Sequence, residues 1–136
     1  MKASETVQKM IQTKNRTTVL ATTDKSGNIN IAMFGSLELV DEGTMRMMLG
    51  DNRTYANLTE NKKAACLVTL PGKTGMSTEG CRLYLTVNRI MDDGEEWEQV
   101  KSEIKARIGG AAEILKHLVI FDIRDVRPIL DLGQKI

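Results

Sequence analysis

Short runs of β-branched and alternating residues dominate this sequence and predict a chain built mainly from strands. In residues 81–91, for example, Leu83, Leu85 and Val87 alternate with other residues at the period of a half-buried strand. Residues 64–70 are almost wholly apolar, so we expect this strand to be buried on both faces. The six expected strands cover residues 17–23, 29–40, 44–50, 64–70, 81–91 and 118–131.

Helical periodicity is confined to a few segments. Residues 4–14 carry apolar side chains at helical spacing, behind a serine suited to the N-cap position. The clearest helix covers residues 95–108, where acidic residues come first and basic residues follow, as the helix dipole favours. A short helix is also expected within the polar segment 51–62, beginning near Arg53 or Thr54.

The connections between the expected strands select an antiparallel fold. The turns at residues 24–28 and 41–43 are too short for the crossover that two parallel strands need. No GxGxxG or GxxxxGK[ST] motif is present, so we exclude a doubly wound nucleotide-binding fold. Gly35 lies inside the second strand and predicts a bulge or a close approach to the backbone. We therefore expect one mainly β domain over residues 1–136, a six-stranded antiparallel barrel with flanking helices.

Composition removes several classes of function. The chain has 19 Lys and Arg against 18 Asp and Glu, whereas nucleic-acid-binding domains carry a basic excess. No apolar run is long enough to span a membrane and no secretory signal is present, so we expect a cytoplasmic protein that binds neither membrane nor nucleic acid. One histidine and two cysteines are too few for an ordinary zinc site or a disulfide framework. If the protein is an enzyme, a cofactor is expected to supply the reactivity.

Isolated reactive residues are interpreted conservatively. His117 stands at the start of a strand and is expected to be a surface or hydrogen-bonded residue rather than a catalytic base. Cys66 lies in an apolar strand and is expected to be buried, whereas Cys81 follows a glycine-rich loop and is expected to be partly exposed. The acidic residues in 92–96 are interpreted as a turn and a helix start, not a metal site. The methionines of the third strand are interpreted as core residues, except Met48 at its end.

The strongest chemical signal lies at the junction between the third strand and the helix after it. A helix N-terminus offers unpaired N–H groups, and Arg53 adds a forked donor and Thr54 a hydroxyl group. Gly50 would let a ligand approach the backbone. These features suit a phosphate group. The alternative is an ordinary capped helix in which Arg53 is solvated or paired with Asp51.

Three segments of the sequence resemble the flavin-binding split-barrel family of pyridoxamine 5′-phosphate oxidase-like proteins. The hairpin that opens these domains is similar to residues 19–28, VLATTDKSGN. Their phosphate-binding helix and the strand after it are similar to residues 53–64, RTYANLTENKKA. The long strand, turn and helix that follow are similar to residues 81–101, CRLYLTVNRIMDDGEEWEQVK. The resemblance extends over nearly the whole chain, and the order and spacing of the segments make it fairly specific.

This resemblance implies an FMN-binding split barrel of Greek-key type that forms a homodimer, with the flavin in a groove at the subunit interface. It also implies a flavin-dependent oxidoreductase that acts on a small substrate. Arg53 and Thr54 match the positions that hold the FMN phosphate. The second strand is implied to edge the isoalloxazine and ribityl chain, and the end of the third strand to flank the ring. These further positions are Ala32, Met33, Phe34, Gly35 and Ser36 in the second strand and Met48, Leu49 and Gly50 in the third.

The sequence departs from the family pattern at two points. Ala32 and Met33 stand where family members often carry polar side chains, so flavin binding would depend on the backbone and on Arg53. No histidine follows His117, so the Arg–His substrate element of the true pyridoxamine oxidases is missing and pyridoxamine oxidation is not expected. No catalytic side chain is assigned.

Three alternatives to a flavin enzyme stay open. The chain could be a non-catalytic flavin carrier or electron-transfer protein, or the same barrel could hold a deazaflavin or haem. The haem alternative depends on His117, the only ordinary axial ligand in the sequence. We further expect the glycine-rich loop at residues 71–80 to be a mobile flap near the flavin groove.

Overall fold

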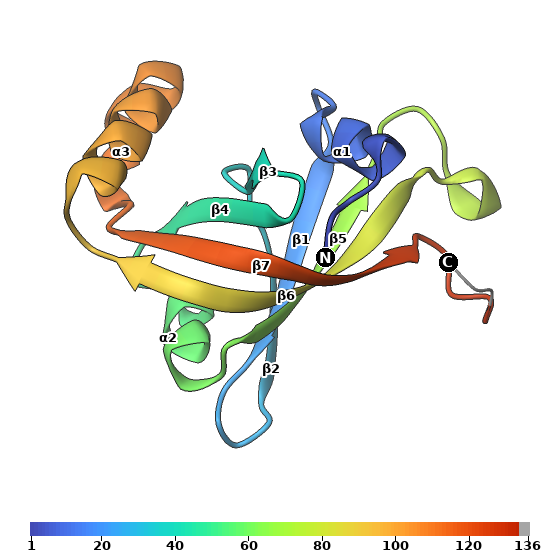
Figure 1. The fold of residues 1–136 in the computed structure, drawn as a ribbon, viewed down its shortest axis with the longest axis horizontal. Coiled ribbons are helices and arrows are strands. Elements are labelled where there is room, and N and C mark those ends of the chain that lie inside the picture. Colours follow the sequence, from blue (N-terminus) through green and yellow to red (C-terminus); the bar gives the residue numbers. More distant parts are fainter. Residues whose placement is uncertain (134–136) are drawn as a thin grey trace.

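The computed structural model describes residues 1–133 and contains one antiparallel sheet flanked by helices (Figure 1). The strands are β1 (Thr17–Thr23), β2 (Ile29–Met33), β3 (Glu38–Asp41), β4 (Thr44–Leu49), β5 (Lys63–Thr69), β6 (Gly80–Met91) and β7 (His117–Pro128). The helices are α1 (Glu5–Gln12), α2 (Arg53–Glu60) and α3 (Glu95–Ile108), with 3₁₀ turns η1 (Gly75–Ser77) and η2 (Gly109–Ile114). The strand order across the sheet is β2-β1-β5-β6-β7-β4-β3.

The described residues form seven strands where the sequence predicts six, because the segment 29–40 makes two strands. β2 and β3 lie at opposite edges of the sheet, and only residues 34–37 connect them. Since a chain spans at most about 3.6 Å per residue, the two edges at this point lie within about 18 Å of each other. The sheet is therefore strongly curled without closing, which is a split barrel. The expected bulge at Gly35 is instead the break between the two strands.

The main core fills the inside of this curled sheet. Leu20 pairs with Cys66 across β1 and β5, and Cys66 pairs with Leu83 across β5 and β6. All three are buried, as is Phe121 of β7. Ile11 of α1 packs against the same core from one end of the barrel. Alternation along each strand thus turns one face inward, as the period of these segments predicts.

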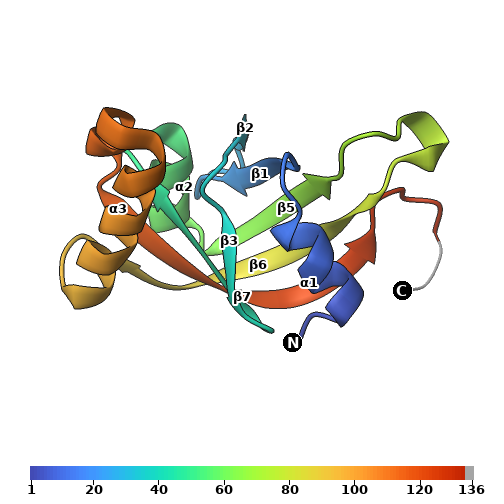
Figure 2. The same ribbon diagram turned by 90° about the horizontal axis from the view of Figure 1, so that it is seen from above.

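A second, smaller core lies under α3. Val100 and Ile104 pack against the start of β7, where Leu118 and Ile120 are buried. Met48 of β4 belongs to this cluster, whereas its neighbours on either side belong to the main core. Figures 1 and 2 show α3 at one end of the molecule and α1 well apart from it, with β3 between them. This separation leaves a gap in the helical cover on that side of the sheet.

Several local expectations agree with the structure. α3 covers residues 95–108 as predicted, and the side chain of Ser4 accepts a hydrogen bond from the Val7 amide at the start of α1. The last strand ends earlier than predicted, at Pro128, which has no N–H to donate to a ladder. No helix among residues 1–133 is long and apolar enough to cross a membrane.

Two expectations about individual segments are wrong, and a third is not met within this chain. β5 is not buried on both faces, because its burial alternates and residues such as Leu67 are half-exposed. Cys81 is 2% exposed rather than partly exposed, since it points into the core as the partner of Val68. The loop 71–80 lies at the end of the sheet away from α2 and α3 (Figures 1 and 2). Within this chain the loop is therefore no flap over the cavity described below.

Candidate functional site

A cavity of about 530 Å³ opens between the end of β4 and α3. Three segments line it: residues 33–36 at the end of β2 and in the connection to β3, residues 48–52 at and after the end of β4, and part of α3 and η2. The lining includes Met33, Phe34, Gly35, Ser36, Met48, Leu49 and Gly50, which are seven of the ten cofactor-binding residues expected from the sequence. Most of the surface that faces the cavity is carbon, so an aromatic ring system suits it.

Sequence reasoning missed the wall that faces these segments. Asp51 and Asn52 extend the lining toward α2, and the opposite side is made by Ile104, Arg107, Ile108, Ile114 and Leu115. Ile108 and Ile114 are more than half exposed, although both are large and apolar. No local signal marks these residues, because α3 and η2 reach the end of β4 only through the return of the chain into β7.

Hydrogen bonds to two backbone carbonyls of β4 hold the cavity walls together. The hydroxyl of Ser36 donates a hydrogen bond to the Met48 carbonyl at 3.2 Å, which ties the connection between β2 and β3 to the end of β4. The Lys116 amide donates to the Leu49 carbonyl at 2.9 Å, which ties the segment before β7 to the same point. The end of β4 is therefore held from both sides.

Two glycines of the cavity differ in what surrounds them. A Cβ on Gly50 would lie 2.7 Å from the Ile114 carbonyl oxygen, so this position has no room for a side chain. A Cβ on Gly35 would meet no atom within 4 Å. The sequence suggests that Gly50 lets a ligand approach the backbone, but in the structure it is η2 that packs closely against Gly50. Open space lies beside Gly35 instead.

The N-terminus of α2 adjoins the cavity. The side chain of Asn52 caps the helix by accepting a hydrogen bond from the Tyr55 amide at 2.8 Å. The amides of Arg53 and Thr54 have no hydrogen-bond partner within residues 1–133, and neither does the Arg53 guanidinium, which is exposed. These donors can receive an anion at the helix terminus.

Thr54 and Ala32 are less accessible than residues that contact a bound flavin should be. Thr54 is 2% exposed, and its hydroxyl accepts a hydrogen bond from the Asn30 side chain at 3.2 Å. Ala32 pairs with Leu20 across β2 and β1 and is half-buried. Neither residue lines the cavity, and nor does Arg53. The structure thus gathers the expected ring contacts in the cavity and leaves the expected phosphate contacts just outside it.

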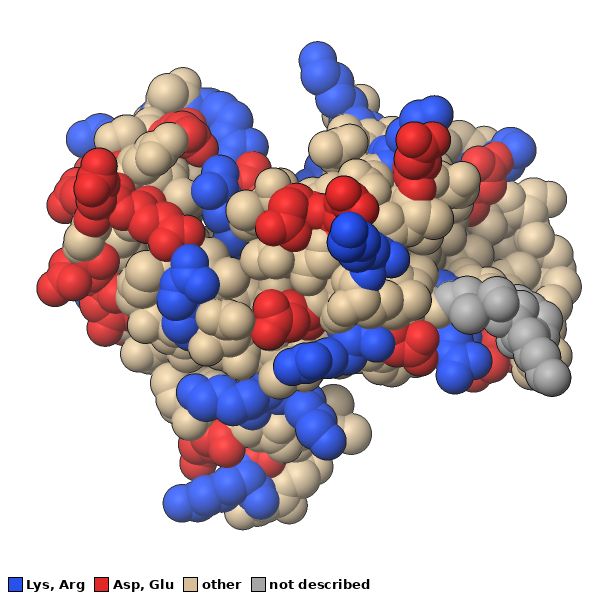
Figure 3. Space-filling view, viewed as in Figure 1, with Lys and Arg blue, Asp and Glu red and all other residues tan. Residues whose placement is uncertain are grey.

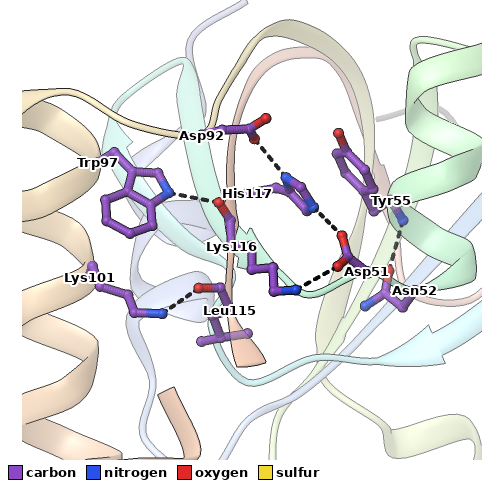
Figure 4. Close-up of polar contacts among 9 residues, drawn as sticks. All are labelled: Asp51, Asn52, Tyr55, Asp92, Trp97, Lys101, Leu115, Lys116 and His117. Atoms are coloured by element: carbon purple, nitrogen blue, oxygen red, sulfur yellow. Dashed lines mark hydrogen bonds and ion pairs between the residues drawn. The ribbon is translucent and has the colours of Figure 1, made fainter. Parts of the chain in front are cut away.

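His117 sits between two carboxylates beside this helix terminus (Figure 4). Its Nε2 lies 2.7 Å from Asp51 and its Nδ1 lies 2.6 Å from Asp92. Its ring stacks on Tyr55, with centroids 3.5 Å apart and planes 2° apart. Burial acts to lower the pKa of His117, but the hydrogen bonds to Asp92 and Asp51 outweigh it and raise the pKa above its usual value. His117 is therefore a hydrogen-bonded residue, as expected, with both ring nitrogens engaged.

The carboxylate of Asp51 borders the expected anion site, but it has hydrogen-bond partners of its own. Its second oxygen accepts a hydrogen bond from the Lys116 ammonium at 2.8 Å. This contact and the contact with His117 lower the pKa of Asp51. The carboxylate thus remains ionised and is paired with the Lys116 ammonium and the His117 ring. The alternative pairing of Asp51 with Arg53 does not occur.

The cysteines take no part in this site. Burial raises the pKa of the Cys66 thiol to about 12 and that of the Cys81 thiol to about 11. Both are therefore uncharged and poorly nucleophilic at neutral pH. Residues 1–133 contain no group of three His, Cys, Asp or Glu residues arranged to hold a metal ion.

Comparisons with known proteins agree with this fold. The family model described as pyridoxamine 5′-phosphate oxidase matches residues 3–129. An FMN-binding protein from Syntrophomonas wolfei subsp. wolfei has a similar structure, with a TM-score of 0.81 and 26% identity over 94% of this chain and 86% of that chain. No curated protein matches the sequence.

Two more distant structures share the fold. HutZ, a haem storage protein from Vibrio cholerae, has a TM-score of 0.70 and 17% identity, over 98% of this chain and 100% of that chain. An F420 reductase has a TM-score of 0.67 and 15% identity, over 91% of this chain and 98% of that chain. The fold therefore occurs in proteins named for three different ligands.

Proposed function

The chain belongs to the pyridoxamine 5′-phosphate oxidase family, and from this premise we propose that it binds FMN and acts as a flavin-dependent oxidoreductase on a small substrate. The observation that carries the proposal is the largely apolar cavity of about 530 Å³ that ends at the N-terminus of α2. A flat ring and a phosphate group need these two environments next to each other. Bound FMN would supply hydride and electron transfer.

The residues of this chain divide the binding between them. Residues 33–36 and 48–50 would enclose the ring, with backbone groups as the polar contacts because few of their side chains can hydrogen-bond. The free amides of Arg53 and Thr54 and the Arg53 guanidinium would hold the phosphate. The Lys116 ammonium pairs with Asp51, so the repulsion between this carboxylate and the phosphate would be reduced. The protein would thus position the flavin and exclude water.

The contacts of the His117 ring favour FMN over haem as the ligand. Both of its ring nitrogens lie within hydrogen-bond distance of a carboxylate, and the ring is covered by Tyr55. Ligation of iron would require one of these charged contacts to break. His117 is the only histidine of the chain, so the haem alternative loses its ordinary ligand.

We also propose that two copies of the chain associate through the outer face of β2, β1 and β5. Ile29, Ile31 and Met33 of β2 are 68–80% exposed. Their cross-strand neighbours on this face include Val19 and, beyond it, Leu67, so the apolar surface is continuous. A surface of this kind on an edge strand favours association. Met33 also lines the cavity, so the partner would cover part of the flavin.

The cytoplasm is the proposed location. Cys66 and Cys81 are both free thiols buried in the core, with no disulfide between them. Free cysteines are ordinary in a reducing compartment. Export of the protein to an oxidising compartment in its native host would contradict this part of the proposal.

The proposal is tested by titrating the purified protein with FMN, a deazaflavin and haemin in parallel. We expect saturable binding of one FMN per chain, seen as quenching of flavin fluorescence, and weaker binding of the other two. Oxidation of NADH or NADPH by the FMN-loaded protein would then distinguish an oxidoreductase from a flavin carrier. Tight binding of haemin without FMN binding would overturn the assignment.

A further inference from the structure

A second, polar cleft lies between α1 and α3. Figure 3 shows the surface notched between the part that carries α3 and the part that carries α1, with Lys and Arg side chains along the notch. A cleft of about 270 Å³ is lined here by Gln12 and Arg16 near α1, by Glu38 of β3 and by Arg107 of α3. Nothing in the proposed flavin site uses Arg16 or Glu38.

The positive charge of Arg16 is uncompensated. Its Nη2 donates to the Leu37 carbonyl at 2.6 Å and its Nη1 donates to the Thr13 carbonyl at 3.3 Å. Its Nε is buried without a hydrogen-bond partner, and no carboxylate within residues 1–133 forms an ion pair with it. The guanidinium is half-buried and held by two carbonyls, and an anion in the cleft would bind the remaining N–H groups of Nη1 and Nη2.

The acidic residue of the cleft does not offset this charge. One oxygen of Glu38 accepts a hydrogen bond from the Arg46 Nε at 2.7 Å, so its charge is already paired. Arg107 is exposed and forms no ion pair among the described residues. Two unpaired guanidinium groups therefore face a cleft whose single carboxylate has a partner of its own.

This cleft is continuous with the cavity beside α2. Gly35, Ser36 and Arg107 line both of them. No Cβ stands at Gly35, and open space surrounds that position. A molecule held in the cleft by one end could therefore extend past Gly35 into the cavity.

We propose that the cleft between α1 and α3 binds the carboxylate or phosphate group of a small organic anion, held by Arg16 and Arg107. The rest of that molecule extends past Gly35 toward the larger cavity. Its assignment as the second reactant, beside the flavin, rests on the proposed function. The binding of an anion in the cleft does not, because it depends only on the two arginines.

The test is a titration of flavin-free, ¹⁵N-labelled protein with sodium phosphate and, separately, sodium malonate at constant ionic strength. We expect saturable shifts of the amides of Gly35, Ser36 and Leu39 with at least one of the two probes. The probe that saturates identifies the anion as a phosphate or a carboxylate. In Arg107→Gln the affinity should fall about tenfold, because one charge-assisted contact is lost.

The matched control is Arg124→Gln, which removes an exposed arginine on β7 and should leave the affinity unchanged. Equal affinities in the two variants would overturn the proposal, as would shifts that sodium chloride reproduces or shifts confined to Arg53 and Thr54. Adding FMN to the same samples keeps the two proposals separate. Failure of FMN to bind contradicts the flavin site alone, since anion binding in the cleft is measured on flavin-free protein.

Discussion

Arg53 is the residue whose loss should separate phosphate recognition from ring recognition. Its guanidinium is exposed and unpaired in the described chain, next to two free amides of α2. A charge-assisted contact contributes roughly 1.5–3 kcal/mol, so Arg53→Ala should weaken FMN binding about tenfold to a hundredfold. Riboflavin has no phosphate, so its affinity should be weak and nearly unchanged. Fluorescence titration with both flavins at fixed salt measures these affinities.

Two controls accompany this prediction. Arg124→Ala removes an exposed arginine elsewhere and should not alter FMN affinity. Thr54→Ala should cost less than Arg53→Ala, because the Thr54 hydroxyl is buried against Asn30 and the amides of α2 remain. Equal FMN affinity in the parent and in Arg53→Ala would contradict the phosphate site.

Gly50 and Gly35 provide a matched pair for the packing of the cavity wall. A Cβ at position 50 would overlap the Ile114 carbonyl, so Gly50→Ala should lower the free energy of unfolding by about 1–3 kcal/mol. Gly35→Ala places its methyl group in open space and should leave stability nearly unchanged. Urea unfolding of the two variants measures the difference. Equal stabilities would show that η2 does not pack on the end of β4 as described.

At the scale of elements, His117 joins the start of β7 to the start of α2 and to the turn before α3. It does so through the carboxylates of Asp51 and Asp92, which are themselves largely exposed. The pKa of His117 in the folded protein lies above its ordinary value of 6.5. The stabilisation is therefore fully present below about pH 6.5 and is lost as the pH rises through the folded-state pKa.

His117→Asn should thus destabilise the protein in a pH-dependent way. We expect a loss of roughly 1 kcal/mol at pH 6, since the two carboxylates are partly screened by solvent. The difference from the parent should shrink as the pH rises to 9, because the parent then loses its imidazolium. Urea unfolding of both proteins between pH 5.5 and pH 9 follows this. A difference that grows with pH would mean that His117 is buried in its neutral form.

At the scale of the whole molecule, the outer face of β2, β1 and β5 should control the oligomeric state. Ile31 is 68% exposed in the middle of the edge strand β2, so Ile31→Lys should convert a dimer to a monomer at micromolar concentration. Val40 is 45% exposed on β3, at the opposite edge, and Val40→Lys should leave the dimer intact. Sedimentation velocity distinguishes these states. A parent protein that sediments as a monomer would refute the dimer.

Agreement between sequence and structure is closest where a single segment carries its own signal. The helix at residues 95–108 has the predicted bounds because its apolar spacing and the glycines after it are local features. The segment 29–40 shows the opposite case. Its residues favour extended backbone throughout. No residue within it indicates that the segment divides into β2 at one edge of the sheet and β3 at the other.

The candidate site divides in the same way. Residues 33–36 and 48–50 were identified from the order of family-like segments, and the structure brings them together around one cavity. Arg107 and the apolar residues of η2 were not identified, because they reach that cavity through the turn from α3 back into β7. His117 and its two carboxylate partners, Asp51 and Asp92, lie far apart in the sequence, and no short motif connects them.

The sequence by itself determined the mainly β, antiparallel character of the chain and most of its helices. It could do so because propensity, periodicity and short turns act between residues that are close along the chain. Only the tertiary structure decided that one strand becomes two, that α3 walls the cavity and that His117 bridges two carboxylates. These outcomes depend on the curl of the sheet, which brings distant segments together and is set by the packing of the whole core.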